Sequence, residues 1–201
     1  MIERRFMQSR GGLAVTKRSG AALGTVRGYA ARFNCLSHDL GGFREIIRPG
    51  AFTAALAKPS AEVFALFNHS KDMVLGSTAS GTLRLFEDSR GLRFEVDMPD
   101  TALGRDLLTL MRRGDVVGAS FAFSLAQGGQ KFVKDSRGHV TREIHSVAAL
   151  HDASIVTAPA YPQAYAAAEP PHAAAPASLA AARSHAALAL SRMRRALAAT
   201  G

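Results

Sequence analysis

The sequence of 201 residues predicts a β-rich α+β fold. Short segments that alternate between apolar and polar residues, or that are apolar throughout, recur between residues 21 and 165, as is typical of strands. Residues 101–113 instead carry their apolar side chains at helical spacing. Apolar residues make up 47% of the chain and charged residues 20%, which is typical of a folded domain.

The first elements expected along the chain are two strands and a short helix. Residues 25–33 alternate between apolar and polar side chains and are predicted to form a strand. Residues 49–52 read Pro-Gly-Ala-Phe, a turn that can open a short helix through residue 57. Residues 62–67 form a short apolar strand that ends at a histidine-containing loop.

Next come a hairpin and the one long helix. Residues 82–87 and 92–97 flank the turn sequence Asp-Ser-Arg-Gly, which predicts that they pair. Asp100 is a good N-cap for a helix over residues 101–113, and Gly114 is placed to end it. The apolar stripe of that helix consists of Leu103, Leu107, Leu108 and Met111.

Two further strands complete the expected body. Residues 116–125 and 144–156 are predicted strands, and residues 127–130 form a loop between them. Within the first of these strands Phe121 and Phe123 share one face and are expected to point into the core. Ser120 lies on the opposite face, between small residues that leave space above its hydroxyl group.

The charge is concentrated at the two ends of the chain. The net charge is +9, of which +4 lies in residues 1–20 and +3 in residues 166–201. We therefore predict a loose basic arm over residues 1–20, a folded body over 21–165 and an extension over 166–201. In the extension 16 of 36 residues are alanine, which predicts a flexible linker followed by a helix. An unstructured tail is the alternative.

Several classes of function are excluded or disfavoured. One cysteine, Cys35, allows no intrachain disulfide and no thiolate zinc cluster. No two histidines have helical metal-ligand spacing, no glycine-rich phosphate loop follows a strand, and no run is apolar and long enough to span a membrane. The N-terminus lacks the apolar stretch of a secretory signal. We expect no cofactor, no metal and no specific nucleic-acid partner.

Three separate places supply the groups of a nucleophilic site. His69 follows an apolar strand, Ser120 lies within a strand, and His151 with Asp152 interrupts a strand that otherwise looks buried. A serine hydroxyl becomes a nucleophile when a histidine takes its proton, and a third group holds that histidine. Because neighbouring strand residues point to opposite faces, only one of His151 and Asp152 is expected to face His69.

The sequence resembles the prohead proteases of tailed bacteriophages and gene transfer agents, which are distantly similar to the herpesvirus assemblins. The resemblance covers residues 24–162. It rests on six segments in this order: Gly28-Tyr29-Ala30, residues 46–52 (IIRPGAF), Phe67-Asn68-His69, residues 112–115 (RRGD), residues 117–123 (VGASFAF) and residues 150–162 (LHDASIVTAPAYP).

The resemblance implies a compact β-barrel core flanked by helices, similar to the herpesvirus proteases. It implies His69 as general base and Ser120 as nucleophile. The phage family commonly has glutamate at the place of Asp152, and the assemblins have a second histidine there. Asp152 is therefore the expected third member and His151 the alternative.

The implied function is a serine endopeptidase that cleaves scaffold or major capsid protein segments during head maturation, and also its own ends. It would act inside the procapsid in the host cytoplasm, with capsid protein and scaffold as partners and with self-association as a further possibility. The alternatives are a non-catalytic assembly protein that keeps the protease fold and binds scaffold, and a fused protease–scaffold whose tail is the scaffold.

Overall fold

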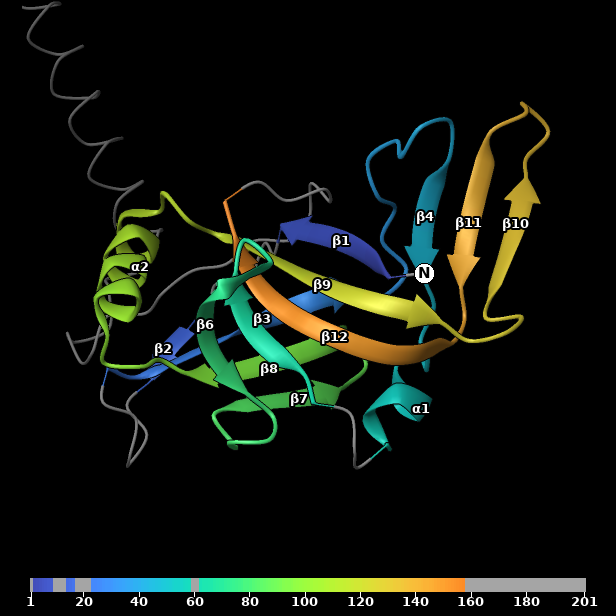
Figure 1. Cartoon of the computed structure of the whole chain (residues 1–201). Helices are drawn as coiled ribbons and strands as arrows, with labels where there is room; N and C mark the ends of the chain where they lie inside the picture. The colour runs from blue at the N-terminus through green and yellow to red at the C-terminus, as the bar shows by residue number, and fades with distance from the viewer. Residues whose placement is uncertain (1, 9–13, 17–22, 59–61, 158–201) are drawn as a thin grey trace, which may run out of the picture. The chain divides into compact units, whose positions relative to one another are not determined.

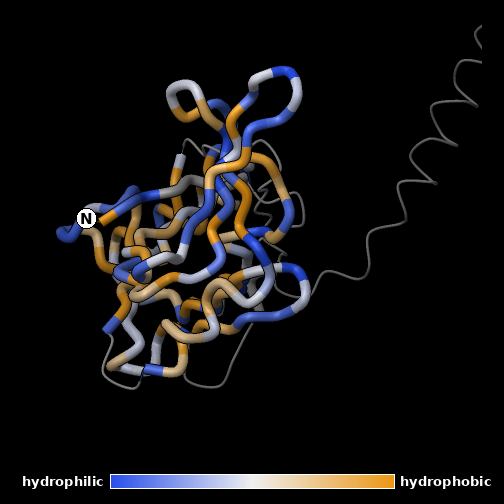
Figure 2. Tube along the Cα trace, turned by 90° about the vertical axis from the view of Figure 1, so that its right-hand side faces the viewer, coloured by the Kyte–Doolittle hydropathy of each residue, from blue (hydrophilic) through white to orange (hydrophobic). Residues whose placement is uncertain are grey.

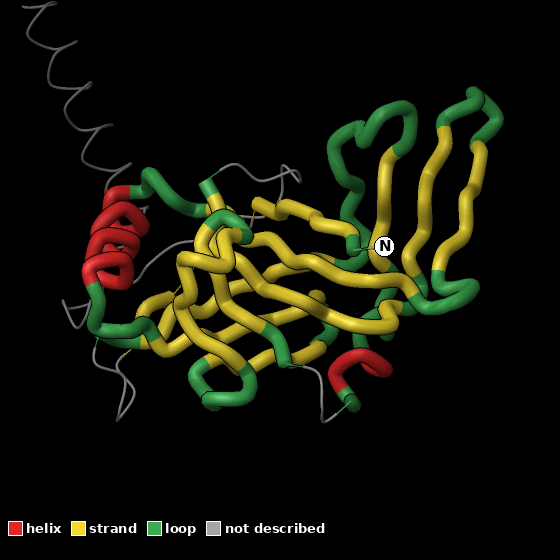
Figure 3. Tube along the Cα trace, in the orientation of Figure 1, coloured by secondary structure: helices red, strands yellow, loops and turns green. Residues whose placement is uncertain are grey.

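A computed structural model describes residues 2–8, 14–16, 23–58 and 62–157 of the chain. The chain divides into two units, residues 1–171 and 172–201, and every described residue lies in the first. Strands dominate this unit, with helix α2 (Ala102–Arg113) at one end and the short helix α1 (Thr53–Leu56) near the other (Figures 1 and 3). The predicted linker and helix over residues 166–201 lie outside the described residues.

A five-stranded sheet forms the centre of the described body (Figure 1). Strands β12 and β5 run parallel, and the other neighbours in the sheet are antiparallel. Because β12 and β5 are parallel, their carboxyl ends lie at the same edge of the sheet, beside the start of β9. Its strands are, in spatial order, β1 (Glu3–Gln8), β9 (Gly118–Leu125), β12 (Val147–Val156), β5 (Phe64–Phe67) and β6 (Ser70–Ser77).

A second, antiparallel sheet contains the predicted hairpin. The Asp88 carboxylate accepts the N–H groups of Arg90 and Gly91 at 2.8 and 3.2 Å, which stabilises the turn between its two strands. The predicted pairing of residues 82–87 with 92–97 is confirmed. The order of the sheet is β2 (Ala14–Thr16), β3 (Thr25–Arg32), β8 (Gly91–Asp97) and β7 (Leu83–Glu87).

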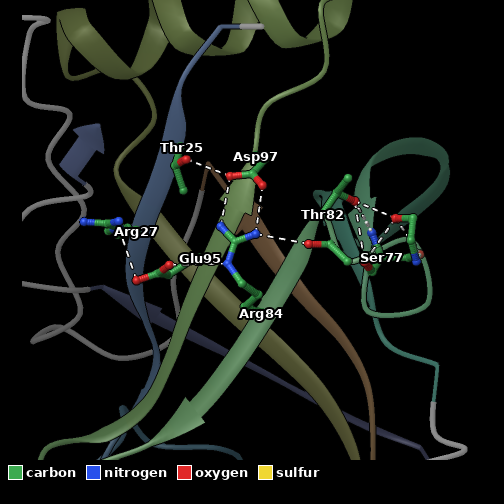
Figure 4. Close-up of polar contacts among 9 residues, drawn as sticks. Thr25, Arg27, Ser77, Thr82, Arg84, Glu95 and Asp97 are labelled. Carbon is green, nitrogen blue, oxygen red and sulfur yellow. Dashed lines mark hydrogen bonds and ion pairs between the residues drawn. The ribbon is translucent and has the colours of Figure 1, made fainter. Parts of the chain in front are cut away.

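The second sheet has one apolar and one polar face. Side chains on its apolar face, such as Val26 and Phe94, are fully buried. On the other face Arg84 binds Asp97 at 2.8 and 2.9 Å, and the Thr25 hydroxyl donates to the same carboxylate (Figure 4). The hydrogen bond to Asp97 raises the pKa of the Arg84 guanidinium. The alternation expected for residues 25–33 is observed up to Tyr29, after which a register shift between Tyr29 and Ala31 interrupts it.

The third sheet, β10 (Gln130–Lys134), β11 (Val140–Ile144) and β4 (Arg44–Ile47), stands to one side of the five-stranded sheet (Figure 1). The prediction of a single strand over residues 144–156 was wrong at its start. Ile144 ends β11 and pairs with Ile47, whereas Val147 begins β12 and pairs with Leu125. The chain passes from one sheet to another at this point.

The prediction of a loose arm over residues 1–20 was wrong for its described parts. Strand β1 pairs with β9 over six residues, from Glu3 opposite Phe123 to Gln8 opposite Gly118. Strand β2 pairs with β3. The physical reason is that the backbone groups along the edges of β9 and β3 need hydrogen-bond partners, which a neighbouring strand supplies through its backbone.

Aromatic packing forms the core between the sheets. Phe121 and Phe123 are completely buried, as predicted, with ring centroids 5.0 Å apart. The ring of Phe52, which precedes α1, meets Phe121 edge-on at 5.5 Å. Hydrophobic stretches run through the middle of the body, whereas many loops at its margins are more hydrophilic (Figure 2). The core therefore fixes the part of β9 around Ser120 from the face opposite the Ser120 side chain.

Helix α2 matches the predicted range apart from its cap. The Thr101 hydroxyl, rather than the Asp100 carboxylate, accepts the N–H of Gly104 at 3.2 Å. Gly114 ends the helix in the left-handed conformation, with φ of 85°, as its position predicted. Neither described helix has the length and apolar character that crossing a membrane requires.

The described strands form three open sheets, and no closed barrel is present among them. The structure therefore confirms the β-rich α+β class, and the finer expectation of a compact barrel is not confirmed.

Candidate active site

Ser120 is the third residue of β9, on the face opposite the aromatic core. Phe121 and Phe123 fill one side of the strand, so Ser120 and Ala122 face the other. The partner directly across from Ser120 on β12 is Ser154, and on the other side of the strand it is Phe6. The position of the Ser120 hydroxyl is thus set by strands on both sides.

His69 occupies the two-residue turn between β5 and β6. Both residues of this turn have positive φ, 51° at Asn68 and 57° at His69. Two successive positive φ angles are the requirement of a type I′ hairpin turn, in which asparagine is favoured at the first position. The left-handed backbone at His69 therefore sets a direction for the imidazole that differs from the one a strand residue would have.

This turn is also attached to the end of β12. The Asn68 N–H donates to the Ile155 carbonyl at 2.9 Å, and its side-chain Oδ1 accepts the Thr157 N–H at 3.0 Å. Contacts from both the backbone and the side chain of Asn68 thus hold the loop beside the strand that carries Asp152.

The structure brings His69, Ser120 and Asp152 together. His69 Nε2 lies 2.6 Å from Ser120 Oγ, and His69 Nδ1 lies 2.7 Å from Asp152 Oδ1. The histidine and aspartate side chains are 5% and 7% exposed, and Ser120 is fully buried. The three groups come from positions 51 and 83 residues apart, so the fold alone creates this arrangement.

Asp152 reaches the imidazole although its side chain is one carbon shorter than glutamate. The pairing of β12 with β9 shifts at this point: Leu150 lies opposite Phe123, but Asp152 lies opposite Ala122. One extra residue, His151, is therefore accommodated in β12 as a β-bulge, which redirects neighbouring side chains.

The same bulge overturns the expectation that His151 and Asp152 point to opposite faces. Both residues line one pocket. His151 Nε2 contacts Ser124 Oγ at 2.7 Å, whereas His69 Nδ1 contacts Asp152 Oδ1. Strict alternation fails here because a bulge interrupts the two-residue period.

Ser154 joins the same cluster and was not singled out by the sequence pattern. Its Oγ donates to Asp152 Oδ1 at 2.8 Å and lies 3.3 Å from His69 Nδ1. Ser154 is fully buried. The sequence signal was present: Ser154 follows Asp152 by two positions on a strand, and such residues share a face.

The arrangement can perform proton transfer. An ionised carboxylate accepts hydrogen bonds, so Asp152 favours the neutral imidazole with its proton on Nδ1. Nε2 is then left as the acceptor for the Ser120 hydroxyl. This is the order of groups that activates a serine as a nucleophile.

A pocket of about 380 Å³ opens beside His69. Its wall is largely apolar, with ionisable groups from Arg4, Glu62, Lys71 and Asp152 and the imidazole of His151. It provides space for part of a ligand next to the imidazole. Among the described residues no cluster of three or more His, Cys, Asp or Glu side chains could hold a metal ion.

The fold and the site define a β-rich protein with the Ser-His-Asp arrangement of serine hydrolases. The model of the caudovirus prohead serine protease family matches residues 13–175, and the chain belongs to this family. It is 33% identical over 147 residues to the prohead protease of Enterobacteria phage HK97, an alignment that covers 72% of this chain and 60% of that protein. No solved structure matches the chain.

Proposed function

We propose that this protein is a serine endopeptidase with Ser120 as nucleophile, His69 as general base and Asp152 as the group that orients and stabilises the imidazole. The observation that carries the proposal is the continuous chain of contacts from Asp152 Oδ1 through the imidazole to Ser120 Oγ, at 2.7 and 2.6 Å. Membership of a serine protease family supports the same assignment.

The reaction proceeds in two halves. Ser120 Oγ attacks the carbonyl carbon of the peptide while His69 Nε2 takes the hydroxyl proton. The C–N bond then breaks, and the imidazolium gives that proton to the leaving amine. Water next attacks the acyl-enzyme, with His69 again accepting and returning the proton, which releases the acid and restores Ser120. Asp152 stabilises the imidazolium in both halves.

The substrates follow from the family and from the name of the relative in phage HK97. We place the cleavage in segments of the major capsid protein or the scaffold, and in the chain's own ends, inside the procapsid of an infected host cell. We also propose that the fold of this protein is similar to that of the herpesvirus proteases. The basic net charge of +9 suits an acidic protein substrate or scaffold.

Access to the nucleophile requires movement. Ser120 has no exposed surface, so a peptide reaches its hydroxyl only after covering groups are displaced. The pocket beside His69 already offers space for substrate residues at the neighbouring group. A covered nucleophile would keep such a protease inactive until the shell has assembled.

The test is co-expression with a candidate substrate, the major capsid protein of the same phage or prophage. The wild-type chain is expected to shorten the capsid protein, and Ser120→Ala to leave it at full length. Ser124→Ala is the matched control, because it removes a hydroxyl from the same strand face without touching His69. Capsid processing by Ser120→Ala would end the enzymatic assignment and favour the alternative, a non-catalytic assembly protein with this fold.

A further inference from the structure

The Ser154 hydroxyl contacts two members of the site, His69 and Asp152. It does so on the Nδ1 side of the imidazole, away from Ser120. It donates to Asp152 Oδ1 at 2.8 Å and approaches His69 Nδ1 to 3.3 Å. Ser154 also lies directly opposite Ser120 in the β9–β12 ladder, and opposite residues of an antiparallel pair share a face. One fully buried hydroxyl is thus part of the site without a role in the three-residue arrangement.

From this geometry we propose that Ser154 is a positioning residue that fixes the protonation pattern of His69. A hydroxyl has one hydrogen and two lone pairs. Because Ser154 gives its hydrogen to Asp152, the oxygen facing His69 Nδ1 can only accept. Both groups around Nδ1 are then acceptors, so the neutral imidazole must carry its proton there and present the Nε2 lone pair to Ser120.

Burial makes this contact necessary for Asp152 as well. The Asp152 side chain is 7% exposed, and a buried carboxylate without hydrogen-bond donors is strongly disfavoured. Two donors are described on its Oδ1, the imidazole and the Ser154 hydroxyl. Ser154 therefore holds the carboxylate in place when His69 is engaged in proton transfer with Ser120.

The inference rests on the proposed function and has its own kinetic test. Ser154→Ala is expected to lower kcat about 10- to 100-fold, the order for losing a hydrogen bond to a charged group, with KM little changed. Ser154→Thr keeps the hydroxyl and suits a strand, so it is expected to restore most of the rate. Ser124→Ala, which loses a hydroxyl bonded to His151 instead, is expected to stay within about twofold of wild type.

A second measurement does not depend on activity. In protein labelled with ¹⁵N-histidine, wild-type His69 is expected to carry its proton on Nδ1, and that proton's resonance is expected to move in Ser154→Ala. In Ser124→Ala the resonances of His151 are expected to change while those of His69 stay. Thermal unfolding of each variant confirms that the compared proteins are folded, and Ser154→Thr provides the comparison if the alanine variant fails to fold.

The outcomes separate this inference from the proposed function. If wild type cleaves substrate and Ser120→Ala does not, but Ser154→Ala cleaves as fast as Ser124→Ala, the role of Ser154 is overturned and the protease assignment stands. A slower Ser154→Ala whose His69 Nδ1 resonance is unchanged also overturns it, because the hydroxyl would then act through packing alone. If wild type itself fails to cleave, the proposed function fails first.

Discussion

Asn68 and Thr157 join the turn that carries His69 to the end of β12: the Thr157 N–H donates to Asn68 Oδ1 at 3.0 Å. The turn has positive φ at two consecutive non-glycine residues, which only a few residue types tolerate. The contact therefore holds an unfavourable backbone conformation in place beside Asp152.

Removal of this contact is expected to impair catalysis more than folding. Asn68→Gly keeps a residue that adopts positive φ but deletes the acceptor for the Thr157 N–H. We expect kcat/KM to fall about three- to tenfold, in line with one neutral hydrogen bond, while the melting temperature changes little. Asn68→Asp keeps the acceptor oxygen and is expected to remain within about twofold of wild type. Full activity in Asn68→Gly would show that the Asn68 backbone contact to Ile155 suffices.

The third member of the catalytic group can be identified by two substitutions. Asp152→Asn replaces an acceptor by a donor next to Nδ1 and is expected to lower kcat about 10³- to 10⁴-fold, because the imidazole adopts the wrong tautomer. His151→Ala is expected to lower it less than about tenfold, since its described contact is with Ser124.

The comparison needs both variants under the same conditions, with cleavage of one capsid-derived peptide as the measurement. An equal loss in the two variants, or a larger loss in His151→Ala, would mean that His151 rather than Asp152 supports His69.

A buried ion cluster attaches β1 to the third sheet. Arg142 is 6% exposed and binds Glu3 of β1, Gln130 of β10, and Glu45 of β4, which is fully buried. The hydrogen bond to Glu3 raises the pKa of the Arg142 guanidinium. Arg142→Met is expected to lower the free energy of unfolding by about 3–5 kcal/mol, because it removes the guanidinium that binds the fully buried carboxylate of Glu45.

Urea unfolding measures this effect, and Arg105→Met is the control. Arg105 pairs with Asp100 where both side chains are more than half exposed, so its removal is expected to change the free energy by less than about 1 kcal/mol. Equal effects of the two substitutions would mean that the cluster around Arg142 contributes no more than a surface pair.

The ion pair between Arg48 and Glu143 makes the free energy of unfolding depend on pH. The hydrogen bond from Arg48 holds the pKa of Glu143 below its usual value of 4.5. A carboxyl with a lowered pKa stabilises the folded state above its unfolded pKa and loses that contribution as pH falls through the folded value. At pH 7 we therefore expect Arg48→Met to have a lower free energy of unfolding than wild type. At pH 3 we expect this difference to be smaller. An undiminished difference at pH 3 would show that the carboxylate charge is not its source.

Elements defined by local chemistry could be predicted from the sequence. The hairpin with its Asp-Ser-Arg-Gly turn, the helix ended by Gly114, and the inward side of Phe121 and Phe123 depend on neighbouring residues, and all are observed. Strand β1 could not be predicted in this way, because its sequence lacks regular alternation and its backbone pairs with β9 across more than a hundred residues.

The candidate site was predictable as a set of groups but not in its details. His69, Ser120 and Asp152 were expected together, and the structure places them in contact. Strand alternation predicted only that one of Asp152 and His151 faces His69, and the family resemblance favoured Asp152. The bulge at His151 breaks that alternation. Register shifts of this kind depend on the partner strand, so no local pattern indicates them.

The most direct test of the central claim is labelling of the folded protein with a small fluorophosphonate, followed by mass spectrometry of the modified peptide. We expect one covalent adduct on Ser120, strongly reduced labelling in His69→Ala, and none in Ser120→Ala. An unlabelled wild-type protein, or an adduct that forms equally well without the His69 imidazole, would contradict the claim that this histidine activates this serine.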